Sequence, residues 1–139
     1  MPDCRTRYPI LLIHGLNCRD DWIFSYWGPV TELLRARGAQ VYLSGQDAWG
    51  AVPRNAWALL RRSREVLQET GARKLNLLAH SKGGLEARYL ISTLGFAGRV
   101  ASLTTICTPH HGSRAAEAWL GRERVCRLAG PRLESFWRA

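Results

Sequence analysis

The stretch that decides the fold reads Leu75-Asn76-Leu77-Leu78-Ala79-His80-Ser81-Lys82-Gly83-Gly84. An apolar run leads into Ala79 to Gly83, and residues with helical spacing follow. In this context a serine occupies a sharp turn between a strand and a helix, with its Oγ exposed. The stretch therefore predicts that Ser81 is a nucleophile and that the chemistry is acyl transfer through a serine ester.

On both sides of this stretch, apolar strands alternate with helical segments. Tyr8 to Ile13 is a continuous apolar run, as in a strand buried on both faces. We expect strands at 8–13, 40–44, 74–79 and 100–107, and helices at 29–37, 54–69 and 83–93. The alternation predicts an α/β fold with about four parallel strands and helices on both faces of the sheet. Because sites in such sheets lie at the carboxyl ends of strands, His14-Gly15-Leu16 and His80-Ser81-Lys82 should meet at one edge.

The composition fits a single globular domain. The chain has 139 residues, of which 46% are hydrophobic, enough for a sizeable core. No apolar run approaches the roughly 18 residues that cross a bilayer. The first residues, 1–5, contain no charged-then-apolar signal region, so we expect a cytoplasmic protein. The cysteines lack metal-ligand spacing, which favours reduced thiols, and we expect neither a metal nor a cofactor. They are Cys4, Cys18, Cys107 and Cys126.

The basic charge is the second global feature. The net charge is +9, and the densest basic cluster is Arg61-Arg62-Ser63-Arg64. Helical spacing places Ala56, Leu59 and Val66 on one face and the arginines mostly on the solvated side. This pattern favours an ordinary solvated helix face, and we expect no nucleic-acid partner.

Several motifs together resemble one known family. They are Tyr8-Pro9-Ile10-Leu11-Leu12-Ile13-His14-Gly15-Leu16, Tyr26-Trp27-Gly28, Gly38-Ala39-Gln40-Val41-Tyr42, Ala79 to Tyr89, and Thr108-Pro109-His110-His111-Gly112-Ser113. In this order and spacing they resemble the N-terminal half of bacterial triacylglycerol lipases of the α/β-hydrolase superfamily. The resemblance implies a partial α/β-hydrolase fold over 1–113 that lacks the C-terminal strands. For the arginine-rich tail, 114–139, we expect a short helix and then weakly structured chain.

The resemblance also implies a mechanism. Ser81 Oγ would attack the carbonyl carbon of a carboxylic ester of the acylglycerol class, and an acyl-enzyme would form. The backbone N–H groups of Leu16 and Lys82 would form the oxyanion hole, and the Lys82 side chain would have no part in the chemistry. Gly83 and Gly84 would let the turn approach its neighbours closely. His14 and His80 are expected to fix loop geometry by hydrogen bonding.

The rest of a catalytic triad is missing from the sequence. In this superfamily the order is Ser, then Asp or Glu, then His. No aspartate follows Ser81, and the carboxylates that do follow it are Glu86, Glu117, Glu123 and Glu134. No histidine follows Glu117. The sequence thus predicts a nucleophile and an oxyanion hole without their general base.

Three hypotheses follow. The first is a truncated or split lipase-like hydrolase, weak or inactive alone. The second is a non-catalytic remnant that binds a second copy, or a complementary C-terminal fragment, through the open edge of the strand at 100–107. The third is a short hydrolase that uses His110 or His111 as its base. The aromatic side chains Tyr26 and Trp27 are compatible with either an acyl pocket or core packing.

Overall fold

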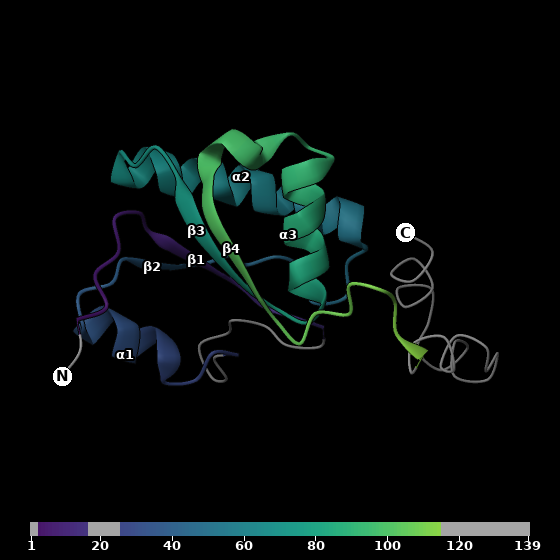
Figure 1. Ribbon diagram of the computed structural model, residues 1–139, viewed down its shortest axis with the longest axis horizontal. Helices are drawn as coiled ribbons and strands as arrows, with labels where there is room; N and C mark the ends of the chain where they lie inside the picture. Colours follow the sequence, from purple (N-terminus) through teal and green to yellow (C-terminus); the bar gives the residue numbers. More distant parts are fainter. Residues whose placement is uncertain (1–2, 17–25, 115–139) are drawn as a thin grey trace.

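The protein is a parallel sheet with helices on both faces (Figure 1). This computed structural model describes residues 3–16 and 26–114. The elements are β1 (Ile10–Ile13), α1 (Val30–Ala36), β2 (Val41–Leu43), α2 (Val52–Thr70), β3 (Leu75–His80), α3 (Lys82–Ser92), the 3-10 helix η1 (Phe96–Arg99) and β4 (Val100–Ile106). The four strands lie in the order β2-β1-β3-β4, and every pair is parallel. The expected fold class is confirmed. The tail from residue 115 to residue 139, with its expected short helix, lies outside the described residues.

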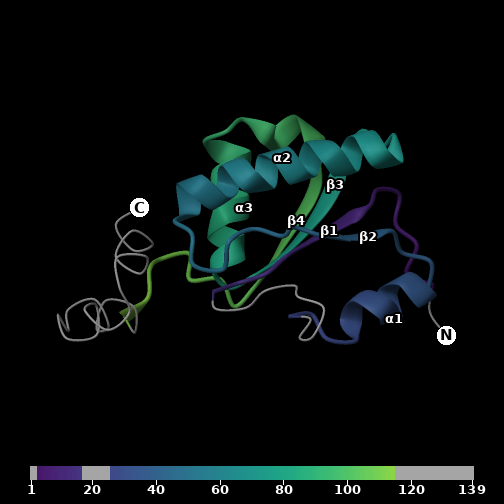
Figure 2. The same ribbon diagram turned by 180° about the vertical axis from the view of Figure 1, so that it is seen from behind.

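The two faces of the sheet carry separate cores because successive side chains of a strand point to opposite faces. Leu11 and Ile13 of β1 pack under α2 and α3 in the larger core. Leu12 packs with Val41 in the smaller core, which Leu34 of α1 also covers. Figure 2 shows α2 lying along the sheet on the face opposite α1. This burial on both faces explains why β1 is apolar throughout.

Helix α2 confirms the face predicted from its spacing. Its buried side includes Leu59, Leu60 and Val66, and Arg61 and Arg64 are exposed. Arg62 differs, because its guanidinium donates to Leu43 O at 3.2 Å and pairs with Glu65 and Glu69. The helix ends at Thr70, and Gly71 caps it with a φ of 65°, which a residue with a side chain adopts only with strain.

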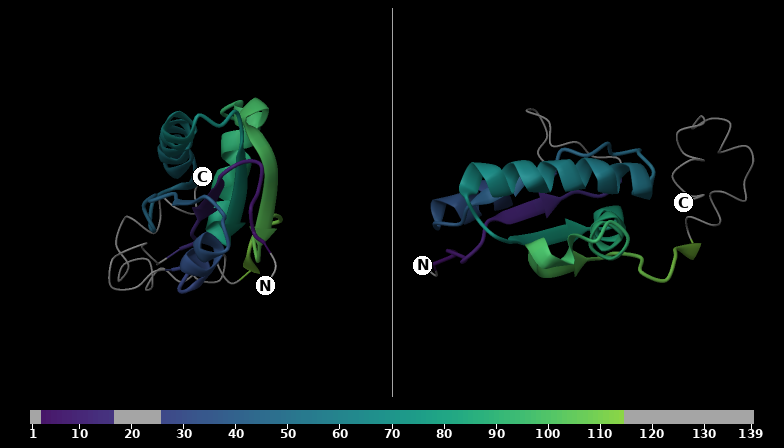
Figure 3. Two further views of the ribbon diagram at one scale, coloured as in Figure 1. Left: turned by 90° about the vertical axis from the view of Figure 1, so that its left-hand side faces the viewer. Right: turned by 90° about the horizontal axis from the view of Figure 1, so that it is seen from above.

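Strand β4 forms one outer edge of the described sheet (Figure 3, left). Its register with β3 pairs Leu78 with Thr104 and His80 with Ile106. Leu78 belongs to the core on the α1 side, so Thr104 and Ile106 share that face, and both are exposed. The predicted open edge is therefore present in the part of the chain that the structure describes. Among the described residues, no helix is long and apolar enough to cross a membrane.

Candidate active site

Ser81 lies between the last residue of β3 and the first residue of α3, on the turn that its flanking sequence predicts. Its φ of 53° and ψ of −126° place a non-glycine residue outside the allowed regions for L-residues. Such a conformation costs on the order of 1–3 kcal/mol and persists only where the surroundings enforce it. Here Ser81 N donates to Ile106 O at 2.8 Å, and Ser81 O accepts from Thr108 Oγ1 at 2.9 Å. The end of β4 and the loop after it therefore hold the strained turn.

The two glycines after the serine permit close packing of this turn, as expected from the sequence. A Cβ on Gly83 would lie 2.5 Å from His14 O and 2.8 Å from Ile13 O, so the first turn of α3 touches the end of β1. A Cβ on Gly84 would collide with the Thr108 side chain. Neither position has room for a side chain, which explains the Gly-Gly pair.

The loop after β1 reaches the same turn. A Cβ on Gly15 would lie 2.9 Å from Ser81 Cβ, so the backbone just before Leu16 lies directly against the serine. Lys82 N belongs to the first residue of α3. The structure thus brings Leu16, Ser81 and Lys82 to one edge of the sheet, and their catalytic roles remain predictions.

The Lys82 side chain carries a role that the sequence did not reveal. It is 2% exposed, and its Nζ lies 3.0 Å from Glu86 Oε1 in an ion pair. Lys82 Nζ also donates to Gly50 O at 2.7 Å and to Ala48 O at 3.3 Å. The side chain therefore ties the start of α3 to the loop between β2 and α2.

Glu86 is completely buried and forms the centre of this network. It accepts hydrogen bonds from Asn55 Nδ2 at 2.7 Å and Gln46 Nε2 at 3.1 Å. Gln46 Nε2 also donates to His14 O at 2.9 Å, which extends the network to the loop after β1. The network joins both loops at this edge to α2 and α3. Glu86 is engaged on all sides, so it is not available as a triad acid.

Burial acts on both charges of this pair. Burial raises the pKa of the Glu86 carboxyl, and the nearby Lys82 ammonium, the Asn55 hydrogen bond and the charge of His14 oppose that rise. Burial also lowers the pKa of Lys82, and Glu86 opposes that shift. Each group thus favours the charged form of the other. The four-residue spacing of Lys82 and Glu86 on a helix was the signal for this pair in the sequence.

All four histidines of the chain lie in the described residues, and two of them hydrogen-bond the loops near Ser81. The ring nitrogens of His14 lie 2.9 Å from Gly15 O and 3.1 Å from Gln46 O. His80 Nδ1 bonds the Tyr26 hydroxyl. The centroid of the Tyr26 ring lies 5.8 Å from that of the His14 ring and 5.5 Å from that of the His80 ring. These contacts favour core packing over an acyl pocket as the role of Tyr26.

The histidines after β4 are engaged elsewhere or exposed. His110 Nδ1 accepts from Arg88 Nη1 at 3.1 Å, and His110 Nε2 lies 3.1 Å from Thr105 Oγ1. His111 is exposed. Within residues 3–16 and 26–114, no histidine hydrogen bond goes to Ser81 Oγ. The same residues contain no group of three or more His, Cys, Asp or Glu side chains placed to hold a metal ion.

A strained serine turn after a central parallel strand, packed against the loop of the neighbouring strand, defines the α/β hydrolases as the class of this protein. The chain belongs to the palmitoyl protein thioesterase family, whose model matches residues 9–136.

Curated relatives confirm the resemblance to triacylglycerol lipases. The chain is 41% identical over 117 residues to those of Pseudarthrobacter phenanthrenivorans and Burkholderia plantarii. Each match covers 81% of this chain but only 36% and 32% of the two relatives. The chain thus spans about a third of the length of these relatives.

Solved structures agree on the fold. The mature lipase BlEst2 of Bacillus licheniformis superimposes with a TM-score of 0.72 at 26% identity, over 83% of this chain and 46% of that one. The metagenomic carboxyl esterase MGS0156 has a TM-score of 0.74 at 15% identity, over 94% of this chain and 42% of that one. At that identity the second match bears on the fold alone.

Proposed function

We propose that this chain carries the nucleophile and the oxyanion hole of a lipase-like serine hydrolase that acts on carboxylic esters of the acylglycerol class. The observation that carries the proposal is the Ser81 turn, with its φ of 53° and the Gly15 backbone packed against it. The similarity to triacylglycerol lipases supports the substrate class.

The proposed reaction has two steps. Ser81 Oγ bonds to the ester carbonyl carbon while its proton passes to a base, and the N–H groups of Leu16 and Lys82 stabilise the carbonyl oxyanion. The carbon–alkoxy bond then breaks, the alcohol leaves with a proton, and water later releases the acid and frees Ser81. Because no histidine of the described residues bonds Ser81 Oγ, we propose that this chain is weak or inactive alone.

Ester hydrolysis and covalent labelling test the proposal together. We expect a fluorophosphonate to label Ser81 slowly, and Ser81→Ala to abolish labelling. Ser92→Ala is the matched control, because Ser92 lies at the exposed end of the same helix and bonds Arg88 O. Labelling that is unchanged in Ser81→Ala would show that the turn is not a nucleophile.

A second assay asks whether only the base is missing. We expect added imidazole to accelerate hydrolysis of a short-chain p-nitrophenyl ester in the wild type beyond the rate with Ser81→Ala. His110→Ala and His111→Ala should leave the rate unchanged, since His110 bonds Arg88 and Thr105 instead of Ser81. A loss of activity in a folded variant would support the short hydrolase with its base after β4.

The alternative is a non-catalytic protein that binds through β4, and the exposure of Thr104 and Ile106 favours it. Within the part of the chain that the structure describes, no strand pairs with the outer side of β4, and this edge would accept a strand from a second copy or from a complementary fragment. Sedimentation over a range of concentrations tests self-association. In this alternative, Ile106→Lys reduces association, whereas Ser81→Ala does not.

A further inference from the structure

A cavity lies at the opposite end of the sheet from Ser81. Its volume is about 610 Å³, and residues of α2, of the loop between α2 and β3, and of η1 line it. Because β3 starts directly after this loop and β4 directly after η1, the cavity lies at the amino ends of these strands. Ser81 follows the carboxyl end of β3, so the cavity is separate from the candidate active site.

The cavity gathers positive charge from three places in the sequence. Arg64 comes from α2, Arg73 from the loop after it and Arg99 from η1, and all three are exposed. Among residues 3–16 and 26–114, the ion pairs involve other basic side chains. The carboxylates of α2, Glu65 and Glu69, pair with Arg62. Among the described residues, these three guanidinium groups thus have no carboxylate partner, and they gather positive charge around the cavity that an anion would complement.

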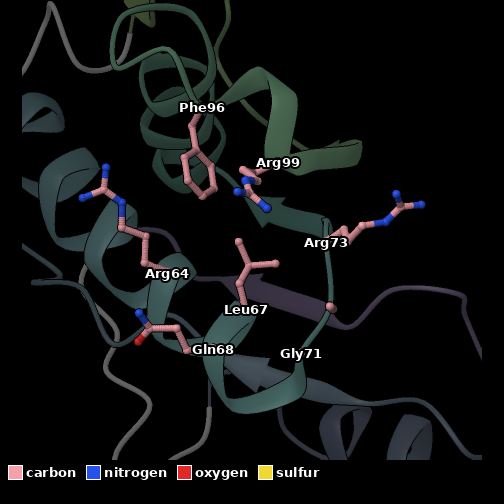
Figure 4. A pocket seen from close by; sticks show the side chains of 8 residues that line it. Arg64, Leu67, Gln68, Gly71, Arg73, Phe96 and Arg99 are labelled. Atoms are coloured by element: carbon pink, nitrogen blue, oxygen red, sulfur yellow. The ribbon is translucent and has the colours of Figure 1, made fainter.

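Apolar side chains form another part of the wall. Phe96 is 7% exposed and belongs to the main core, and Leu67 packs against that core. In Figure 4 the Phe96 ring lies between the guanidinium groups of Arg64 and Arg99, while Arg73 points outward at the far side. The cavity thus joins an apolar surface to exposed guanidinium groups.

These two properties specify a kind of ligand. Guanidinium groups bind carboxylates and phosphates through paired hydrogen bonds. The volume lies within the range of about 300–1,000 Å³ that is usual for small-molecule sites. We propose that this cavity binds an amphipathic anion, with its carboxylate or phosphate on Arg64 and Arg99 and a short alkyl chain against Phe96 and Leu67. This site is independent of the proposed ester hydrolysis, since none of its residues lies in the candidate active site.

Calorimetry with defined probes tests the proposal on the whole chain. We use octyl phosphate, octanoate, inorganic phosphate and octanol, all below micellar concentrations. We expect octyl phosphate or octanoate to bind at least tenfold more tightly than inorganic phosphate and octanol. The preferred headgroup distinguishes a phosphate source from a fatty-acid source. Inorganic phosphate that binds as tightly as octyl phosphate would overturn the role of the apolar wall.

Substitutions of single arginines separate the cavity from general basic charge. Loss of one charge-assisted hydrogen bond at an exposed site corresponds to about a tenfold weaker Kd, which we expect for Arg64→Gln and Arg99→Gln. Arg61→Gln is the matched control, because Arg61 is exposed on the same helix as Arg64 and does not line the cavity. Equal weakening by all three variants, or by none, would refute the site. On the unmodified protein, we expect nuclear Overhauser contacts between the octyl chain and the Phe96 ring, and their absence under saturating ligand would also refute it.

Discussion

The buried ion pair between Lys82 and Glu86 yields the most demanding prediction. Lys82→Met removes the ammonium 3.0 Å from a carboxylate that has no solvent exposure. Asn55 and Gln46 still donate to that carboxylate, but no positive charge of this helix faces it any longer. Removing one partner of a buried pair costs about 3–5 kcal/mol. Since a domain is typically stable by about 5–15 kcal/mol, this loss is a large fraction of the total.

A double-mutant cycle separates the pair from the packing of the two side chains. Glu86→Gln keeps an oxygen for Asn55 and leaves Lys82 Nζ with the Gly50 and Ala48 carbonyls. We expect the double variant to cost at least about 2 kcal/mol less than the sum of the single variants, because it buries no unpaired charge. Urea unfolding followed by far-UV circular dichroism gives the three free energies, provided that the m value stays constant.

The same cycle on Arg62 and Glu65 is the matched control. This pair lies three residues apart on a helix, and its side chains are 29% and 46% exposed. Exposed pairs of this kind contribute about 0–1 kcal/mol. Additive free energies at Lys82 and Glu86, or a coupling no larger than in the control, would refute the reasoning that this network holds the loops at the active edge.

Three further predictions concern the same region. Gly83→Ala should destabilise the protein by more than about 2 kcal/mol in urea unfolding, because the added Cβ would lie 2.5 Å from His14 O. Gly98→Ala is the control and should have little effect, because a Cβ at Gly98 would have no atom within 4 Å. Ser81→Gly should be more stable than Ser81→Ala by about 1 kcal/mol, since glycine accepts a φ of 53° without strain, and equal stabilities would show that the turn is unstrained. Burial raises the pKa of Glu86 from its ordinary value of 4.5, so its contribution to stability is largest at acidic pH and is lost as the pH rises through the raised pKa. The free-energy difference between wild type and Glu86→Gln should therefore grow as the pH falls towards 4.5, and a difference that shrinks would contradict this sign.

The sequence predicted the features that local patterns control. The uninterrupted apolar run at 8–13 predicted β1, although the strand begins at Ile10 and not at Tyr8. The Ser81 turn was predictable because Gly83 and Gly84 follow at fixed spacing, and the structure shows that both positions exclude a side chain. The short helix η1 was not expected, because its four residues are too few for a periodic pattern.

The role of the Lys82 side chain could not be predicted in the same way. Its partners Ala48 and Gly50 lie more than 30 residues away, in a loop without regular structure. Every residue has a backbone carbonyl, so the sequence does not indicate which carbonyls accept from Lys82. Their position depends on how the tertiary fold places this loop. Only the spacing of Lys82 and Glu86 was visible, and the same spacing is common in exposed pairs.

The network also joins the proposed nucleophile turn to the loop that is proposed to supply an oxyanion donor. Gln46 donates both to Glu86 and to His14 O, and the His14 ring lies against Gln46 O. The loop after β1 is therefore joined through Gln46 to Glu86, and through Glu86 to Lys82 at the start of α3. Oxyanion stabilisation depends on donors that are fixed before the reaction. In the proposed mechanism, a base supplied from another segment or another chain would thus meet a nucleophile already in place, and its arrival should change the rate of Ser81 acylation far more than the stability of the fold.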